Sequence, residues 1–246
     1  MRKLRNLAAI LVGAVAVAGS AYWFAVRPWW QDWGTDPMEA ARPLPGDDVV
    51  PHAPVNDTRA ITIEAPPSAV WPWLVQMGYG RGGWYSYDVI DMKGASADRI
   101  QPDIPPLAVG DIVPTHPGGG FEVKAVEAGH ALVLYIDTAL VRTQAEEARA
   151  TAVEANPANI AAAGALMGAT QPTEFAASWA FILEPAGDGR TRLIERFRAR
   201  FDGGDQPWTK YTLPFMGFGV FVMVRKQMLG IKERVERTPS LPAGTP

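Results

Sequence analysis

The chain has 246 residues, of which 48% are hydrophobic and 20% charged, as in a globular protein with a substantial core. This length fits one good-sized domain or two small ones. The absence of cysteine excludes disulfides, thiolate nucleophiles and cysteine zinc sites. The histidines are widely spaced and form no ligand pair, so we expect no metal and no cofactor; they are His52, His116 and His130.

Residues 1–27 differ in character from the rest of the chain. Three basic residues near the start precede an uncharged apolar stretch, Leu7 to Val26. A helix of this length spans roughly 30 Å, which is the thickness of the hydrocarbon core of a bilayer. The stretch therefore predicts a single-pass membrane anchor, with a cytoplasmic N-terminus and an extracytoplasmic domain. Small residues near its end also fit a cleaved signal peptide.

Outside this segment the chain is acidic. Residues 1–27 contain four basic residues and no acidic one, which leaves 19 basic against 26 acidic residues and a formal net charge of −7. Proteins that bind nucleic acid present a basic surface instead. We therefore expect no nucleic-acid partner.

Residues 28–57 are rich in proline, which fixes φ and removes a hydrogen-bond donor. This juxtamembrane segment is predicted to be extended and to lie over the domain surface. Residues 58–65 alternate as a half-buried strand, with Ile61 and Ile63 on one face. Residues 66–77 predict a short helix that is kinked at Pro72.

The stretch Met77 to Asp88 reads MGYGRGGWYSYD and contains the G-x-G-x-x-G spacing of a dinucleotide loop. That fingerprint must follow a strand and open a helix, whereas here it follows a helix. We interpret the glycines as a tight turn. The aromatic residues after them suit either the mouth of a pocket or plain core packing.

A short strand is expected near residues 111–115, followed by two hairpins. The first hairpin covers residues 121–137 and the second residues 174–201, with Gly187-Asp188-Gly189 as the turn of the second. Between the hairpins, the alanine-rich insertion 143–170 predicts two short helices, the first opened by a Thr143–Glu146 capping box. The insertion is either a mobile segment with no specific function or a flap over a pocket.

The chain closes with a predicted helix, Gly219 to Glu236, and a disordered tail, 238–246. One face of this helix is expected to pack on the sheet through Phe218, Phe221, Val222, Met228 and Leu229. The order of elements gives an α+β fold.

The strand TRLIERFRARF places four arginines on one face and Glu195 on the other. If the arginine face meets solvent, Glu195 points into an apolar interior, where it needs a partner such as Arg99 or a tyrosine hydroxyl. It is then either half of a structural ion pair or a general acid or base with a raised pKa.

The stretches TRAITIEAPPSAVWPWLVQMGYGRGGWYSYD, ASWAFILEP, TRLIERFR and FVMVRKQMLGIKERVE resemble the SRPBCC (START/Bet v 1-like, polyketide cyclase-like) superfamily, in a membrane-anchored bacterial branch. The resemblance also covers residues 32–50, which implies that this segment is ordered against the domain. It implies a helix-grip fold over residues 58–237, an antiparallel sheet curved around a long C-terminal helix, with a largely apolar cavity.

The resemblance implies no shared catalytic residue. We assign eight side chains to the ligand-binding wall: Trp71, Trp84, Tyr85, Tyr87, Arg99, Trp179, Phe197 and Phe218.

These features predict a membrane-tethered binding or carrier domain for a hydrophobic small molecule, lipid or polyketide-like. One alternative is a cyclase or dehydratase that uses Glu195 together with a tyrosine or Asp88 as acid and base. Another is a module that binds a second envelope protein. Of the three, binding without catalysis is favoured.

Overall fold

The computed structural model describes residues 2–91, 94–150, 174–202 and 209–237. The helical elements are α1 (Arg2–Ala21), η1 (Tyr22–Val26), α2 (Arg27–Gln31), α3 (Pro37–Ala41), α4 (Pro67–Val75), α5 (Asp88–Asp91), α6 (Thr138–Ala150) and α8 (Thr209–Arg237). The strands are β1 (Val55–Ile63), β2 (Ile112–His116), β3 (Gly119–Glu127), β4 (Ala131–Asp137), β5 (Glu174–Pro185) and β6 (Thr191–Asp202).

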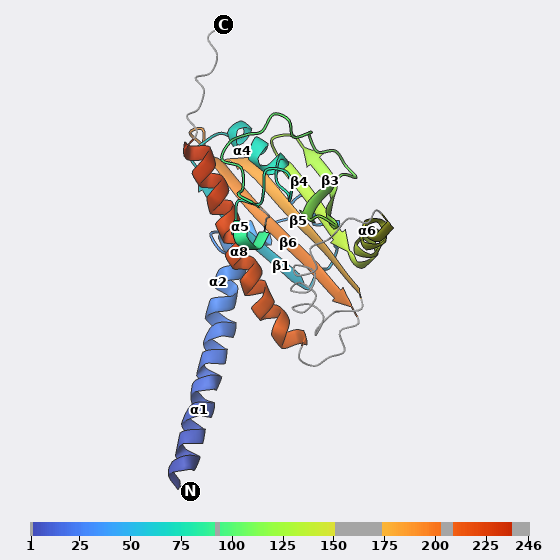
Figure 1. Ribbon diagram of the computed structural model, residues 1–246. Coiled ribbons are helices and arrows are strands. Elements are labelled where there is room, and N and C mark those ends of the chain that lie inside the picture. The colour runs from blue at the N-terminus through green and yellow to red at the C-terminus, as the bar shows by residue number, and fades with distance from the viewer. Residues whose placement is uncertain (1, 92–93, 151–173, 203–208, 238–246) are drawn as a thin grey trace.

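The strands form one antiparallel sheet in the order β1-β6-β5-β4-β3-β2, and α8 crosses one of its faces (Figure 1). The long hairpin β5–β6 is at its centre, and residues with positive φ make its turn as predicted: Gly187, Asp188 and Gly189. The α+β helix-grip arrangement is therefore confirmed. Strand β1 begins three residues earlier than predicted because Val55 already pairs with Ala199 of β6.

The inner face of the sheet, which lies under α8, holds the larger hydrophobic core. On α8 the buried apolar side chains recur every three or four residues, as one face of a helix requires, and all but Phe221 belong to this core: Phe221, Val224, Met228, Ile231 and Val235. The predicted helix face was partly wrong, since Phe218 is 37% exposed and Val222 is 36% exposed. The helix also begins at Thr209 and not at Gly219.

The outer face is covered by the N-terminal collar, residues 32–54. Leu44 packs with alternate apolar residues of β1, β4, β5 and β6 in a second, smaller core. The collar also makes polar contacts with arginines of β6. Arg192 forms an ion pair with Glu39, and Arg196 donates a hydrogen bond to the carboxylate of Asp47 at 2.7 Å. The collar therefore covers Arg192 and Arg196, whereas Arg200 on the same face is exposed. The ordered segment implied by the resemblance is confirmed.

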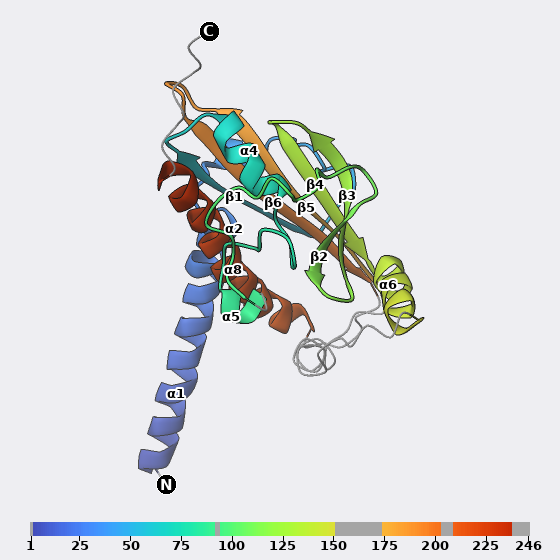
Figure 2. The ribbon, with the colours of Figure 1, turned by 45° about the horizontal axis from the view of Figure 1, so that its top comes forward.

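The glycine-rich stretch forms the predicted tight turn and not a cofactor loop. Gly78 and Gly83 bridge each other with hydrogen bonds of 3.1 Å in both directions, and both have positive φ. The turn carries the chain from α4 back across the inner face to α8 (Figure 2). Its last residues, Trp84 and Tyr85, are buried in the core.

The helix α6 starts at Thr138, five residues before the predicted capping box. Asp137 provides the cap, because its Oδ1 accepts a hydrogen bond from the backbone N–H of Leu140 at 2.7 Å. Thr143 and Glu146 therefore lie inside the helix. The rest of the predicted insertion, from 151 to 170, and the predicted disordered tail lie outside the described residues.

The N-terminal helix α1 projects away from the domain (Figures 1 and 2). Large apolar side chains along it are exposed, including Ile10, Leu11 and Val17. Within the described ranges no helix is both long enough and apolar enough to cross a membrane. The predicted membrane-spanning helix is therefore not supported.

Candidate functional site

Glu195 lies at the centre of the inner face and is completely buried. Strand alternation turns it inward between Leu193 and Phe197, as predicted. Its Oε2 accepts a hydrogen bond from Arg59 Nη1 at 3.0 Å, and its Oε1 accepts one from Trp179 Nε1 at 2.7 Å. Both carboxylate oxygens therefore have a donor, and the predicted partner Arg99 is wrong.

Arg59 binds a second carboxylate at the same site. Its Nη2 donates to Asp57 Oδ2 at 2.9 Å, and its Nε donates to the backbone carbonyl of Trp30 at 3.0 Å. The guanidinium carbon lies 5.8 Å from the ring centroid of Trp30 and 5.6 Å from that of Phe221. Gln31 donates to the other oxygen of Asp57 at 2.9 Å. The cluster thus connects α2, the sheet and α8.

In this cluster two carboxyl groups share one guanidinium in a site without water exposure. Removal from water raises the pKa of Glu195, and the charge of Asp57 raises it further, against the opposing attraction of Arg59. Burial likewise raises the pKa of Asp57. One positive charge does not offset the desolvation of two carboxylates, so at this site burial outweighs the ion pairs.

A stack of aromatic rings occupies the interior beside the cluster. Trp84 stacks on Trp179 with ring centroids 5.5 Å apart and an interplanar angle of 16°. Phe121 and Phe181 pack on the same indole at 5.5 and 5.0 Å. We call this part of the interior the filled half of the inner face. The expected apolar cavity does not occur in it, because side chains fill the space.

From Phe197, which lies opposite Trp179, to the far end of the β5–β6 pair, the inward phenylalanines are only half-buried, and we call this part the open half. It consists of inward-facing residues that follow one another along β5 and β6 in matched register. Three phenylalanines are half-buried: Phe175, Phe197 and Phe201. They flank two small, buried residues, Ala177 and Ala199. The open half is therefore an apolar surface that reaches the Glu195 cluster through Phe197.

Tyr85 was assigned to the ligand-binding wall but is part of the filled half. Its hydroxyl donates to the backbone carbonyl of Trp73 at 3.1 Å and accepts from Gln76 Nε2 at 2.8 Å. Burial raises the pKa of this phenol well above its ordinary value, so it stays protonated. The side chain acts as a buried polar connection between the turn and α4.

Four other assigned residues lie away from the cluster. The Arg99 side chain is exposed, and only its backbone carbonyl contacts Gln76, at 3.4 Å. Trp71 is half-buried at the edge of the larger core, and Tyr87 is exposed. Asp88 accepts a hydrogen bond from Ser96 Oγ at 2.5 Å. The structure thus brings Trp179 to Glu195, with Trp84 stacked on that indole and Phe197 next on the same face of β6, but leaves Asp88 outside.

Sequence reasoning missed Arg59 and Asp57. Only the alternation of Ile61 and Ile63 was used to predict the strand. The same period-two pattern, continued towards the N-terminus, places Arg59 and Asp57 on the face of the strand that carries these isoleucines. Phe218 comes near the cluster indirectly, with its ring centroid 6.0 Å from that of Phe221. Two inward charges of opposite sign on β1 were a readable signal for the partner of Glu195.

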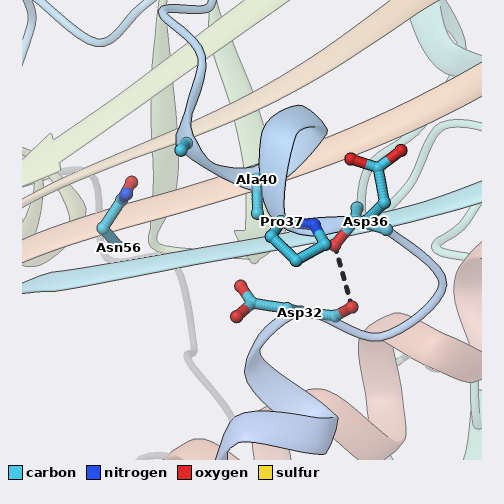
Figure 3. A pocket seen from close by; sticks show the side chains of 7 residues that line it. Asp32, Asp36, Pro37, Ala40 and Asn56 are labelled. Atoms are coloured by element: carbon cyan, nitrogen blue, oxygen red, sulfur yellow. Dashed lines mark hydrogen bonds between the residues drawn. The ribbon is translucent and has the colours of Figure 1, made fainter.

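A hollow lies on the outer side of the sheet, at the collar. It has a volume of about 380 Å³ and is lined by Asp32, Thr35, Asp36, Pro37, Ala40, Ala41 and Asn56 (Figure 3). Asp36 caps α3 there, because its Oδ1 accepts from the backbone N–H groups of Met38 and Glu39 at 2.8 Å. Burial raises the pKa of Asp32, helped by the charge of Asp57. In the part of the chain that the structure covers, no group of His, Asp and Glu could hold a metal ion.

The sheet, the crossing helix and the inward cluster together define an α+β helix-grip domain with an apolar inner face. No protein-family model and no curated protein matches the chain.

Solved structures that resemble it include protein MLL2253 from Mesorhizobium loti, at 18% identity over 74% of this chain and 98% of that one, with a TM-score of 0.35. A protein from Arthrobacter aurescens matches at 12% identity over 75% of this chain and 87% of that chain, with a TM-score of 0.38. The human StarD13 lipid transfer and protein localization domain matches at 13% identity over 74% and 78%, with a TM-score of 0.26. All three TM-scores lie below 0.5, so these likenesses carry no functional conclusion.

Proposed function

We propose that this protein binds a hydrophobic small molecule, of lipid or polyketide-like character, on the open half of the inner face. The observation that carries the proposal is the set of half-buried phenylalanines, Phe175, Phe197 and Phe201, beside a buried charged cluster. Aromatic side chains left partly uncovered beneath a helix offer apolar area that a ligand can remove from water. Membership of the SRPBCC superfamily is part of the same proposal.

Binding can be measured with the purified full chain and cis-parinaric acid, a fluorescent fatty acid. Loss of one phenylalanine contact in Phe201→Ser is expected to weaken binding about ten- to a hundredfold, because a buried aromatic side chain contributes about 1.5–3 kcal/mol. Arg200→Ser is the matched control, since the neighbouring side chain faces the other side of the strand. Absence of saturable binding by the unmodified protein, with no lipid found by mass spectrometry of its extract, would refute the proposal.

The acid–base alternative meets one of its conditions, because Glu195 points inward beside a second carboxyl group, Asp57. However, both oxygens of Glu195 accept hydrogen bonds, and its side chain has no exposed surface. Asp88, the acid–base partner expected from the sequence, lies elsewhere and accepts a hydrogen bond from Ser96. The geometry therefore favours a structural ion pair, and binding remains the better-supported function.

Attachment to the bacterial cell membrane through α1 is the second part of the proposal. Its support is the exposed apolar surface of a helix that projects from the domain, with Val17 71% exposed. Full-length protein should sediment with membranes, and the double variant Leu11→Asp/Val17→Asp should not. Val109→Asp is the control, because this valine is equally exposed, at 67%, in a loop of the domain. Equal sedimentation of both variants would contradict attachment through α1.

A further inference from the structure

Helix α2 packs against β1 and α8 beside the buried cluster of Arg59, Asp57 and Glu195 (Figure 1). Two hydrogen bonds hold it to β1. Arg59 Nε donates to the backbone carbonyl of Trp30 at 3.0 Å, and Gln31 Nε2 donates to Asp57 Oδ1 at 2.9 Å. With α2 in place, Asp57 is 4% exposed and Glu195 is completely buried, so both carboxyl groups are kept from water.

The charges in this cluster are unbalanced. Asp57 of β1 and Glu195 of β6 both pair with one guanidinium, that of Arg59. The other charged groups near it come from α2: Arg27, and Asp32 at the end of the helix. Because these two flanking groups are of opposite sign, the cluster keeps an excess of one negative charge when both of its carboxyl groups are ionised.

The other elements around the cluster do not offset this excess. β5 contributes the indole N–H of Trp179, and α8 contributes the ring of Phe221, neither of which carries a charge. The nearby guanidinium of α8, that of Arg225, lies over the ring of Trp33 at 4.9 Å. Arg196 of β6 points to the outer face, where it forms an ion pair with the collar.

One proton removes the excess charge. Burial raises the pKa of Glu195 and of Asp57, against the attraction of Arg59. Water that reaches the cluster when α2 moves away returns both pKa values towards their ordinary range. Docking of α2 is therefore most favourable at low pH, and it weakens as the pH rises through the raised pKa values of the docked state.

Docked α2 also supports the part of α8 that follows Gly217. Three indoles on α2 and just after it surround the ring of Phe221, with centroid distances of 5.4 Å for Trp29, 6.3 Å for Trp30 and 6.0 Å for Trp33. A Cβ added at Gly217 would lie 2.7 Å from Cη2 of Trp30, so helix and indole are in close contact. The position of this part of α8 therefore depends on α2.

We propose that α2 is a proton-controlled latch, which stays docked while Asp57 and Glu195 hold one proton between them and lifts from the sheet when both are ionised. Lifting frees the part of α8 beside the open half, so a bound hydrophobic molecule exchanges faster at higher pH. This consequence rests on the proposed ligand site, whereas the latch itself does not.

The test measures the distance between α2 and the sheet in the full chain, which has no native cysteine. Nitroxide spin labels are attached to Pro28→Cys in α2 and Asp188→Cys in the β5–β6 turn, both at exposed positions. Double electron–electron resonance gives the distance between them from about pH 5 to about pH 9, a range that brackets a raised carboxyl pKa. Labels at Ala128→Cys and Asp188→Cys form the reference pair, since both positions lie in turns of the sheet.

The pair at positions 28 and 188 should give one distance at low pH and a second, growing population as the pH rises. The ratio of the two should increase by up to about tenfold per pH unit for each carboxyl group that ionises. The reference pair should keep one distance throughout. Cis-parinaric acid should dissociate faster, in stopped-flow measurements over the same pH range, as the second population grows.

Variants of the latch assign the response to the cluster. In Asp57→Asn the carbonyl can accept from Arg59 and the amide can donate to the turned carboxamide of Gln31, so α2 should stay docked at every pH. Gln31→Ala removes the contact of α2 with Asp57 and should move the transition to lower pH. Asp47→Asn is the matched control, because it removes a carboxylate that pairs with an arginine of β6 on the outer face, and it should keep the response.

A single distance between positions 28 and 188 at every pH would overturn the latch. So would a second population that grows equally in Asp57→Asn, or a transition that Gln31→Ala does not move. A simultaneous change in the reference pair would also overturn it, because the sheet itself would then be opening. If the distance responds to pH but fatty acid does not bind, the latch stands and the proposed function is refuted. A dissociation rate that stays constant while α2 lifts would refute the effect on ligand exchange.

Discussion

The filled half and the open half of the inner face share one sheet and one helix, yet they differ in what covers them. In the filled half, the turn from Gly78 to Tyr85 inserts Trp84 and Tyr85 between the sheet and α8. In the open half, no comparable turn covers Phe197 among the residues described, and the facing part of α8 exposes Phe218.

The comparison shows that the glycine-rich turn decides where the interior is closed. Strand sequence alone does not, because inward aromatic residues occur in both halves, with Phe181 in one and Phe197 in the other. The cluster of Arg59, Asp57 and Glu195 lies at the boundary between the halves. Changes at the boundary, in the filled half and in the open half should therefore have different consequences.

The largest effect is expected at the boundary. Arg59→Ala leaves two buried carboxyl groups without their cation and should lower the free energy of unfolding by about 3–5 kcal/mol. Urea unfolding followed by circular dichroism measures this loss. Arg198→Ala is the control on the outer face, where the ion pair with Asp47 is longer, at 3.4 Å, and partly exposed. It should cost about 1 kcal/mol or less.

The triple variant Arg59→Ala/Asp57→Asn/Glu195→Gln keeps this prediction testable even if the single variant fails to fold. Removing the two charges along with their cation should restore part of the lost stability. A triple variant no more stable than Arg59→Ala would show that the loss came from packing and not from unpaired charge.

The second effect concerns the closure of the filled half. A Cβ added to Gly230 of α8 would lie 2.2 Å from the backbone carbonyl oxygen of Tyr85, so helix and turn must separate in Gly230→Ala. We expect a loss of about 1–3 kcal/mol in the free energy of unfolding. Amide hydrogen exchange should also become faster in residues 78–85. Unchanged exchange there would argue against the turn as the element that closes this half.

The third prediction is a pH dependence that originates at the boundary. Burial raises the pKa of Glu195 above its ordinary value of 4.5. At a pH between 4.5 and this raised pKa, the folded protein holds more protons than the unfolded chain. The free energy of unfolding therefore falls as the pH rises through this window. Asp57→Asn/Glu195→Gln should make the fall shallower in urea titrations at several pH values. If the free energy of unfolding of the double variant depended on pH as steeply as that of the unmodified protein, the pH dependence would not originate at Asp57 and Glu195.

The smallest effect is expected at the exposed residues 218–220 of α8. Gly219→Ala places a Cβ where no atom lies within 4 Å, in the same helix as Gly230. Alanine favours helix over glycine by about 0.8–1 kcal/mol, so this variant should be slightly stabilised. Thermal unfolding measured beside Gly230→Ala provides the comparison. A lower melting temperature for Gly219→Ala would mean that position 219, like position 230, is packed closely against another element.

The sequence by itself determined the local elements and the direction of Glu195. Period-two alternation fixes which residues of β5 and β6 share a face, and glycine with aspartate fixes the turn between them, because both effects act over a few residues. The helix-grip class and the ordered collar followed from the resemblance of several such stretches to one superfamily. A buried glutamate was predictable in the same way, as was its need for a partner.

Only the tertiary structure decided which partner that is and where the interior is closed. Arg59 meets Glu195 because β1 pairs with β6 in one particular register, across 136 residues of sequence. The inward charges on β1 show that a partner is present, but the register of the whole sheet decides that Arg59 is the residue opposite Glu195. The same holds for MGYGRGGWYSYD, whose glycines allow a turn, while the facing sheet and α8 decide that Trp84 and Tyr85 fill the interior and Tyr87 stays exposed.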